Sequence, residues 1–292
     1  MFTQGKVTDI RGENNVLVGS LDKSSYSGYS TSEGALSIFA PSVNDYIDHI
    51  EKAYPTTKHQ GSSDDRGRGN FHTLDSFQEA SDIFRFRPHE IVQYEDTSLA
   101  LQSPYQAGNE VLWDVTGDFI DMGMFMTGEP EHFGHNVMGN PRGLFATINV
   151  SLLVWGGVKQ EDLLHRSRRV QSLTNWLEAQ NIRTSIRVFS LNQCGYAEIV
   201  VKDYQDQFNI NNLAVATHTD FFRRHIFRQL EWSPTWTYGY GSSISTVKPE
   251  QIGITLTIQG DPSSKKETDK DFDTYQEKIA TAIAEGVHEC HI

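Results

Sequence analysis

The stretch Leu144–Trp155, LFATINVSLLVW, decides the fold. This apolar run is too short to cross a membrane, so it predicts a buried strand. After a Gly-Gly turn, residues 159–180 repeat apolar side chains at helical spacing, and residues 182–191 alternate apolar and basic side chains as a second strand does. A strand, a long helix and a strand in succession are typical of a right-handed crossover between parallel strands. We therefore predict an α/β protein of three layers, with a partly parallel sheet flanked by helices.

Further elements extend outward from this unit. Helices are predicted from Ser42, which forms a capping box with Asp45, from Thr73 to before Pro88, over 218–232, and between Phe272 and Ile283. Strands are predicted at 16–18, 196–202, 211–216 and 253–259. The expected organisation is an N-terminal arm (1–41), an α/β core domain (42–260), and an acidic linker with a C-terminal helix (261–292). We find no internal repeat.

The composition limits the possible function classes. The 292 residues carry 25 Lys and Arg against 38 Asp and Glu, a net charge of −13. Such an acidic balance argues against a broad electrostatic grip on duplex DNA or membranes, whereas single-stranded DNA needs only a narrow basic groove and stacking aromatics. Two cysteines exclude a disulfide framework. With no signal-peptide pattern at the N-terminus, we expect a cytoplasmic protein.

Enzyme motifs are missing from the sequence. It contains neither GxxxxGK[ST] nor GxGxxG, neither GxSxG nor HExxH. His132 and His135, near Glu129 and Glu131, are potential metal ligands, but they lie in a Gly-rich loop without further ligands at a typical spacing. We therefore expect no enzymatic activity, no metal and no cofactor, and a metallohydrolase using these histidines is the weaker alternative.

Basic and aromatic residues form the predicted nucleic-acid site. Arginines bind phosphates and exposed rings stack on bases, and the two kinds lie close together in the sequence WSPTWTYGYGSS that begins at Trp232. The purely structural alternatives are that the arginines lie on solvent-exposed helix faces, paired with nearby acids, and that the rings pack together in an aromatic corner. The candidate residues for single-stranded DNA are Arg66, Arg68, Arg85, Arg87, Arg166, Arg169, Arg223, Arg224, Arg228, Trp232, Trp236, Tyr238 and Tyr240.

The string GDFIDMGMFMTGEPEHFG (117–134) resembles the central motif of an uncharacterised, mainly phage-borne family, G-D-x-I-D-x-G-x-[FY]-x-x-G-E-P-E. SVNDYIDHIEK (42–52), the Asp65–Arg66 pair and FHTLDSFQEA (71–80) are similar too, so the resemblance spans about 42–242. It implies an α/β fold like a von Willebrand A domain without an intact metal site, because NVSLL (149–153) stands where that domain has DxSxS. The motif residues Asp118, Asp121, Gly128, Glu129 and Pro130 are expected to shape a loop.

The resemblance also implies a function. The chain is similar to phage single-stranded-DNA-binding proteins that act as the cofactor of a phage-encoded RNA polymerase, holding melted middle promoters and recruiting the enzyme. The expected partners are thus single-stranded DNA and this polymerase, in the host cytoplasm, with no membrane; an oligomer is possible. The alternative is an α/β adaptor that binds an AAA+ ATPase.

Overall fold

The computed structural model describes most of the elements predicted above. The protein has two parts: the projection, formed by the described residues between 110 and 137, and the body, formed by the other described residues. The described residues are 11–13, 16–21, 35–54, 73–91, 110–114, 119–120, 122–128, 132–137, 144–152, 158–180, 182–192, 195–232, 254–258, 263–284 and 290–291.

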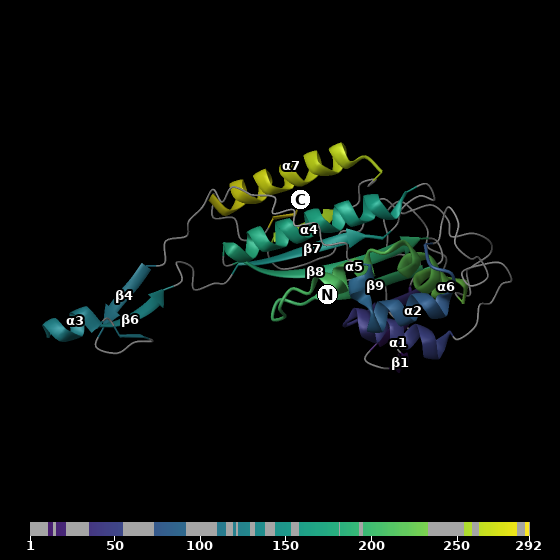
Figure 1. The fold of residues 1–292 in the computed structure, drawn as a ribbon, viewed down its shortest axis with the longest axis horizontal. Helices are drawn as coiled ribbons and strands as arrows, with labels where there is room; N and C mark the ends of the chain where they lie inside the picture. Colours follow the sequence, from purple (N-terminus) through teal and green to yellow (C-terminus); the bar gives the residue numbers. More distant parts are fainter. Residues whose placement is uncertain are drawn as a thin grey trace.

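An eight-stranded sheet forms the centre of the body (Figure 1). Its order is β1-β2-β3-β9-β8-β7-β10-β11, and β3/β9, β8/β7, β7/β10 and β10/β11 pair in parallel while the other pairs are antiparallel. The strands are β1 (Arg11–Glu13), β2 (Val16–Leu21), β3 (Ala35–Ala40), β7 (Phe145–Ser151), β8 (Arg183–Asn192), β9 (Gly195–Lys202), β10 (Ile254–Ile258) and β11 (Cys290–His291). The partly parallel sheet confirms the predicted fold class.

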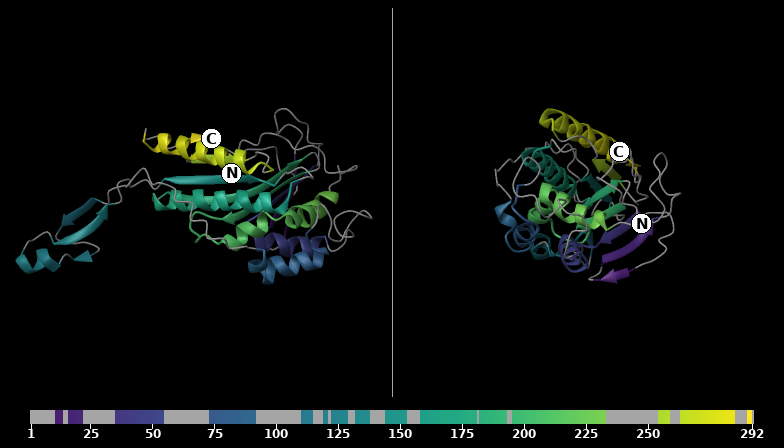
Figure 2. Two further views of the ribbon diagram at one scale, coloured as in Figure 1. Left: turned by 45° about the horizontal axis from the view of Figure 1, so that its top comes forward. Right: turned by 90° about the vertical axis from the view of Figure 1, so that its right-hand side faces the viewer.

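Helices flank this sheet (Figures 1 and 2). α4 (Gln160–Ala179) joins the parallel strands β7 and β8, which is the crossover that the sequence predicts, and α7 (Lys265–Ala284) joins β10 and β11 in the same way. The remaining helices are α1 (Val43–Ala53), α2 (Phe77–Phe86), η1 (Pro88–Glu90), α5 (Ile210–Ala216), the π-helix η2 (Phe221–Ile226) and α6 (Phe227–Glu231). This is the expected three-layer α/β architecture.

Two local predictions need correction. Ser42 caps α1 as predicted, its Oγ accepting from the Asp45 amide at 3.1 Å, but α2 begins at Phe77 behind the cap Ser76 rather than at Thr73. Residues 210–216 form the helix α5 instead of a strand. Its apolar run is too short for its period to distinguish the two, and Asn209 supplies the helix cap.

Both chain ends contribute to the body. The segment predicted as an N-terminal arm supplies β1 to β3, including the strand expected at 16–18. The segment predicted as an acidic linker and helix supplies α7, which packs on α4, and β11, which extends the sheet beside β10. Among the described helices, none has a stretch long and apolar enough to cross a membrane.

The projection stands apart from the body in both Figure 1 and Figure 2. It contains a small antiparallel sheet, ordered β4-β6-β5, and one short helix, α3. The bounds are β4 (Glu110–Asp114), β5 (Phe119–Ile120), α3 (Met122–Thr127) and β6 (Phe133–Val137). The described residues of the 117–134 string therefore lie in this projection.

Candidate functional site

Three of the predicted DNA-contacting arginines lie in η2 and α6, and all three are buried. Arg223, Arg224 and Arg228 are 6%, 0% and 1% exposed. Arg224 donates from Nε to Asp220 Oδ1 at 3.0 Å and from a terminal nitrogen to the Leu74 carbonyl at 2.6 Å. Buried guanidinium groups are stable only when acceptors inside the protein replace water. The prediction that these arginines form an accessible phosphate grip is therefore wrong.

Arg228 ties three helices together. Its guanidinium carbon lies 3.6 Å from the ring centroid of Phe77, at the start of α2. One terminal nitrogen donates to the carbonyl of Tyr54, directly after α1, at 2.8 Å. The cation–π contact and the hydrogen bond both use the positive charge inside the protein, so Arg228 stabilises the packing of α6 against α1 and α2.

Asp220 is the centre of a buried polar network. Its Oδ2 accepts from the Thr73 amide at 2.8 Å, the Thr73 hydroxyl at 2.7 Å and the Leu74 amide at 3.1 Å, while Oδ1 accepts from Arg224. The carboxylate thereby fixes the chain that leads into α2. Burial lowers the pKa of the neighbouring His218 to about 4, although the Asp220 charge opposes the shift, so this imidazole is neutral at neutral pH.

His225 joins the π-helix to α2. Its Nε2 lies 3.0 Å from the Ser81 hydroxyl, and its ring stacks on Phe221 with centroids 5.6 Å apart. Burial, helped by the Arg228 charge, lowers its pKa to about 3. π-Helical turns often occur at functional sites. Here all six residues of the π-helical turn are buried, so the turn holds α2 in place and presents no side chain at the surface.

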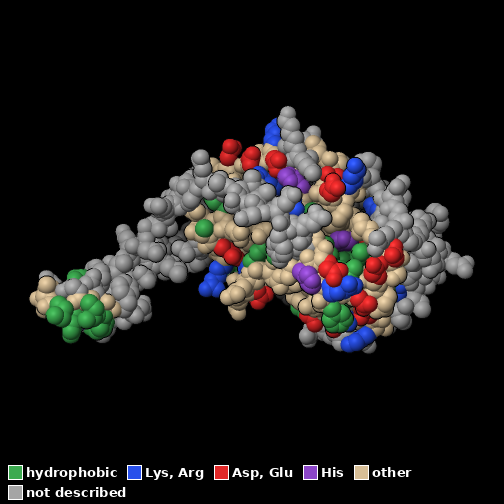
Figure 3. All heavy atoms as spheres, viewed as in Figure 1, with side chains coloured by type: hydrophobic (Ala, Val, Ile, Leu, Met, Phe, Trp, Pro, Cys, Tyr) green, Lys and Arg blue, Asp and Glu red, His purple; other side chains and the backbone are tan. Residues whose placement is uncertain are grey.

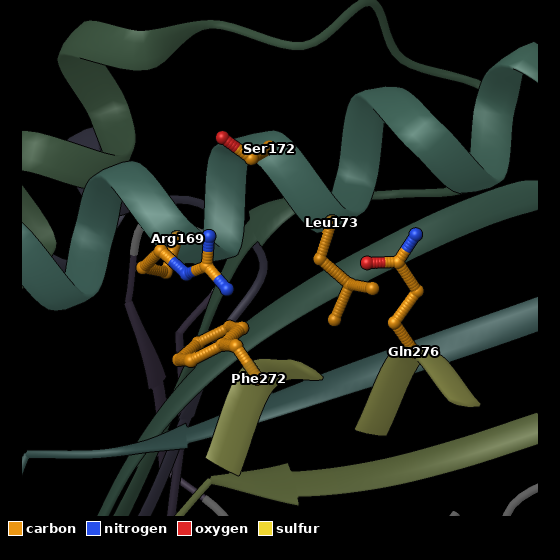
Figure 4. Close-up of a pocket in the computed structure, with 5 residues that line it drawn as sticks. All are labelled: Arg169, Ser172, Leu173, Phe272 and Gln276. Carbon is orange, nitrogen blue, oxygen red and sulfur yellow. The ribbon is translucent and has the colours of Figure 1, made fainter. Parts of the chain in front are cut away.

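Arg166 and Arg169, predicted on the same grounds, are also buried, at 2% and 6% exposure. Arg166 donates to the Ser151 carbonyl at 2.9 Å, at the end of β7. Arg169 pairs with Asp273 at 2.6 Å and lies beside the ring of Phe272, as Figure 4 shows. Neither arginine has the expected accessible position, because Arg166 is directed to the end of β7 and Arg169 lies against α7.

A small hollow remains between α4 and α7. It is lined by Arg169, Ser172, Leu173, Phe272 and Gln276 (Figure 4). Its volume of about 10 Å³ is at the lower limit for a single water molecule. A small-molecule site typically has ~300 Å³ or more, so this hollow is no ligand pocket.

Arg85 and Arg87 are more accessible, but carboxylates neutralise them. Arg85 pairs with Asp48 and, at 2.8 Å, with Glu51, both on α1. Arg87 pairs with Glu90 at 3.1 Å. Pairing within the protein competes with phosphate for both arginines. The described part of the body therefore gathers no basic patch from the arginines predicted to bind DNA.

Trp232 is the aromatic candidate within the described residues, and the structure leaves it partly accessible. It follows α6 directly, it is 39% exposed, and its ring centroid lies 6.1 Å from that of Tyr54, which follows α1. Burial raises the pKa of Tyr54, which is therefore an uncharged phenol at neutral pH. Two helices thus end at one aromatic pair on the surface.

The other five candidates lie outside the described residues. They belong to the two segments that start at this aromatic pair, because 55–72 continues from Tyr54 and 233–253 continues from Trp232. These candidates are Arg66, Arg68, Trp236, Tyr238 and Tyr240.

The metal hypotheses find no support among the described residues, which contain no group of three His, Cys, Asp or Glu side chains able to hold an ion. His132 instead packs its ring on Phe125 and Phe133, with centroids 5.1 and 4.7 Å apart. Asn149, which the resemblance aligns with the first Asp of DxSxS, is 3% exposed, and its Nδ2 has no hydrogen-bond partner.

Sequence reasoning missed the apolar end of the projection. Ile120, Met122, Phe125 and Met126 are among the exposed large apolar residues of the described chain. Figure 3 shows hydrophobic side chains gathered at this end of the molecule. The spacing of Met122, Phe125 and Met126 was a usable signal, because residues three and four apart share one helix face. The Gly-rich surroundings suggested a loop instead.

Comparisons with known proteins identify a family without an assigned activity. No curated protein and no solved structure matches the chain. The family model described as "Domain of unknown function (DUF7192)" matches residues 26–282. This match includes the projection and nearly all of the body, and the chain therefore belongs to the DUF7192 family.

Proposed function

We propose that this protein is a non-enzymatic single-stranded-DNA-binding protein that acts as a cofactor of a phage-encoded RNA polymerase at melted middle promoters. The observation that carries the DNA-binding part is the aromatic pair of Tyr54 and Trp232, with Trp232 39% exposed at the end of α6. An exposed indole offers a face for base stacking, worth about 1–3 kcal/mol per base. The resemblance of the 117–134 motif to the phage family suggests the polymerase.

The sequence around this pair supports the same proposal. Beyond Trp232 the chain continues through Trp236, Tyr238 and Tyr240, and beyond Tyr54 it continues to Arg66 and Arg68. Rings and guanidinium groups thus follow in sequence from both members of one surface pair. This combination suits single strands, whose bases are free to stack, better than duplexes.

The other candidate arginines are either buried or paired with carboxylates, and this changes the expected character of binding. With Arg66 and Arg68 as the phosphate contacts, the plot of log affinity against log salt should have a slope of about −1.4, since each contact on single strands contributes about −0.7. A chain with net charge −13 that binds DNA in this way depends more on stacking than on electrostatic attraction. We therefore expect shallow salt dependence.

The test compares Trp232→Ala with Phe86→Ala. Phe86 is 68% exposed on α2 and has no proposed role, so it is a matched control for loss of an exposed ring. Fluorescence anisotropy with equal-length single-stranded and duplex oligonucleotides gives the affinities. We expect wild type and the control to prefer single strands, and Trp232→Ala to lose about fivefold or more in affinity. Equal affinities for all three proteins, or a preference for duplex, would refute the proposal.

A second function, an adaptor for an AAA+ ATPase, is favoured by the exposed apolar end of the projection, which suits protein–protein contact. This alternative requires no affinity for nucleic acid. Co-purification with an ATPase together with absence of single-stranded-DNA binding at moderate salt would select the adaptor.

A further inference from the structure

The short helix α3 presents an apolar face to solvent. Met122, Phe125 and Met126 occupy positions i, i+3 and i+4 and are 62%, 50% and 77% exposed, and Ile120 beside them is 42% exposed. This spacing is typical of a helix that packs its apolar face on a core. In α3 these three apolar side chains face water instead. We call these four residues the tip.

The described body leaves the tip uncovered. Figures 1 and 2 show the projection extending away from the sheet and helices, and Figure 3 shows the tip at its outer end. Contiguous exposed apolar patches mark interaction sites in soluble proteins. Methionine is common at such sites because its flexible thioether adapts to the shape of a partner.

The charge of the surrounding sequence restricts what the tip binds. Between Pro88 and Asn140 the chain has nine Asp and Glu and no Lys or Arg, so this segment alone accounts for −9 of the net charge of −13. Negative charge of this size repels nucleic acid and anionic membranes. A second copy of the chain has the same acidic character. An apolar groove bordered by Lys and Arg complements both the tip and its surroundings.

We propose that the tip is a docking surface for a groove of this kind on another protein. The inference rests on the proposed function and deepens it, because the groove would belong to the phage-encoded RNA polymerase. DNA binding at Tyr54 and Trp232 and polymerase binding at the tip are then two separate contacts on one chain. A few residues usually contribute most of the binding energy of such contacts. In the tip we expect these residues to be Met122, Phe125 and Met126.

The experiment measures binding of the full-length chain to the purified polymerase by biolayer interferometry, without DNA and over a salt series. The tip variant combines Met122→Ser, Phe125→Ser and Met126→Ser, and Phe86→Ser on the body is the control. We expect the tip variant to lose about tenfold or more in affinity while the control binds as wild type does. Wild-type binding should weaken as salt rises, because the acidic projection attracts a basic rim.

Several outcomes overturn the inference. The inference fails if the tip variant binds the polymerase as tightly as wild type does, or if wild type does not bind the polymerase at all. It also fails if wild type forms a dimer that the tip substitutions abolish, or if wild type sediments with phosphatidylglycerol vesicles and the tip variant does not. Single-stranded-DNA affinity, measured on the same proteins, separates the two proposals. The tip variant should bind DNA as wild type does, whereas Trp232→Ala should lose DNA affinity and keep polymerase affinity.

Discussion

The body and the projection place their side chains in opposite ways. In the body, Arg224 and Arg228 are almost completely buried, whereas in the projection Phe125 and Met126 are at least half exposed. Charge inside a protein is costly unless it is paired, and large apolar groups outside gain nothing from the fold itself. Buried charge in the body thus has a structural explanation in its contacts, and exposed apolar surface in the projection calls for a partner.

The largest expected effect tests the buried network of the body. Asp220→Ala should lower the free energy of unfolding by about 3–5 kcal/mol, because it leaves the Arg224 guanidinium buried without its carboxylate. Urea unfolding followed by circular dichroism measures this change. Asp271→Ala, which removes an exposed carboxylate from α7, should change stability by less than about 0.5 kcal/mol. Equal small effects would mean that the two carboxylates have similar surroundings.

Acid should weaken the same network. The pKa values of His218 and His225 are lowered from 6.5 to about 4 and about 3, so the unfolded chain binds protons before the folded chain does. Stability should therefore be constant above pH 6.5 and fall between pH 6.5 and about pH 4, by up to about 1.4 kcal/mol per pH unit for each histidine.

Urea unfolding at a series of pH values measures this slope. His225→Gln should have a smaller slope of stability against pH than wild type, because one of the two titrating histidines is missing. Constant wild-type stability down to pH 5 would show that the imidazoles are already protonated or are accessible in the folded protein.

A substitution at Arg228 distinguishes a structural role of this residue from a DNA-binding role. Arg228→Met should destabilise the protein by about 1–3 kcal/mol through loss of the Tyr54 hydrogen bond and the Phe77 contact. Under conditions where it remains folded, its plot of log affinity for single-stranded DNA against log salt should keep the wild-type slope, because Arg228 contacts no phosphate. The affinity alone does not decide the question, because Arg228 also holds the Tyr54 carbonyl. Lys278→Met, at an exposed position of α7, is the control. A slope shallower than that of wild type by about 0.7 would return Arg228 to the DNA site.

The smallest expected effect concerns the projection. The tip variant should lower the free energy of unfolding by about 1 kcal/mol or less, because its three side chains are at least half exposed, although Phe125 packs on the ring of His132. Thermal unfolding measures this, and binding of a hydrophobic dye should decrease in parallel. A loss of more than about 2 kcal/mol would mean that these side chains pack against the protein in solution.

Periodicity in the sequence was sufficient to predict the strand–helix–strand unit at the centre of the fold, but not β1, β3, β11 or the elements of the projection. The strand at 145–151, the helix at 160–179 and the strand at 183–192 follow from apolar spacing alone. The cap Ser42 marks the start of α1, and Pro88 follows the end of α2. Residues 210–216 were assigned wrongly because seven apolar and polar residues fit either period. A pattern of seven residues is too short to distinguish a helix from a strand.

The site was harder to predict because burial depends on distant parts of the chain. Arg224 is buried by Leu74 and Asp220, and Arg169 by α7, a hundred residues further along the chain. A cluster of arginines on a helix has the same sequence whether it faces solvent or a buried carboxylate. The exposure of Trp232 agrees with the expectation from its Gly- and Ser-rich surroundings. For the tip, the sequence spacing indicates a shared helix face, but only the structure shows that this face is exposed.

The most direct test of the account maps where single-stranded DNA touches the full-length protein. An oligonucleotide containing 5-iododeoxyuridine is photocrosslinked, and the modified peptides are identified by mass spectrometry. We predict crosslinks at Tyr54, at Trp232 or in the segment 233–243 that follows it, and none in the projection, residues 110–137. Crosslinks in the projection, or none at any position, would contradict the account.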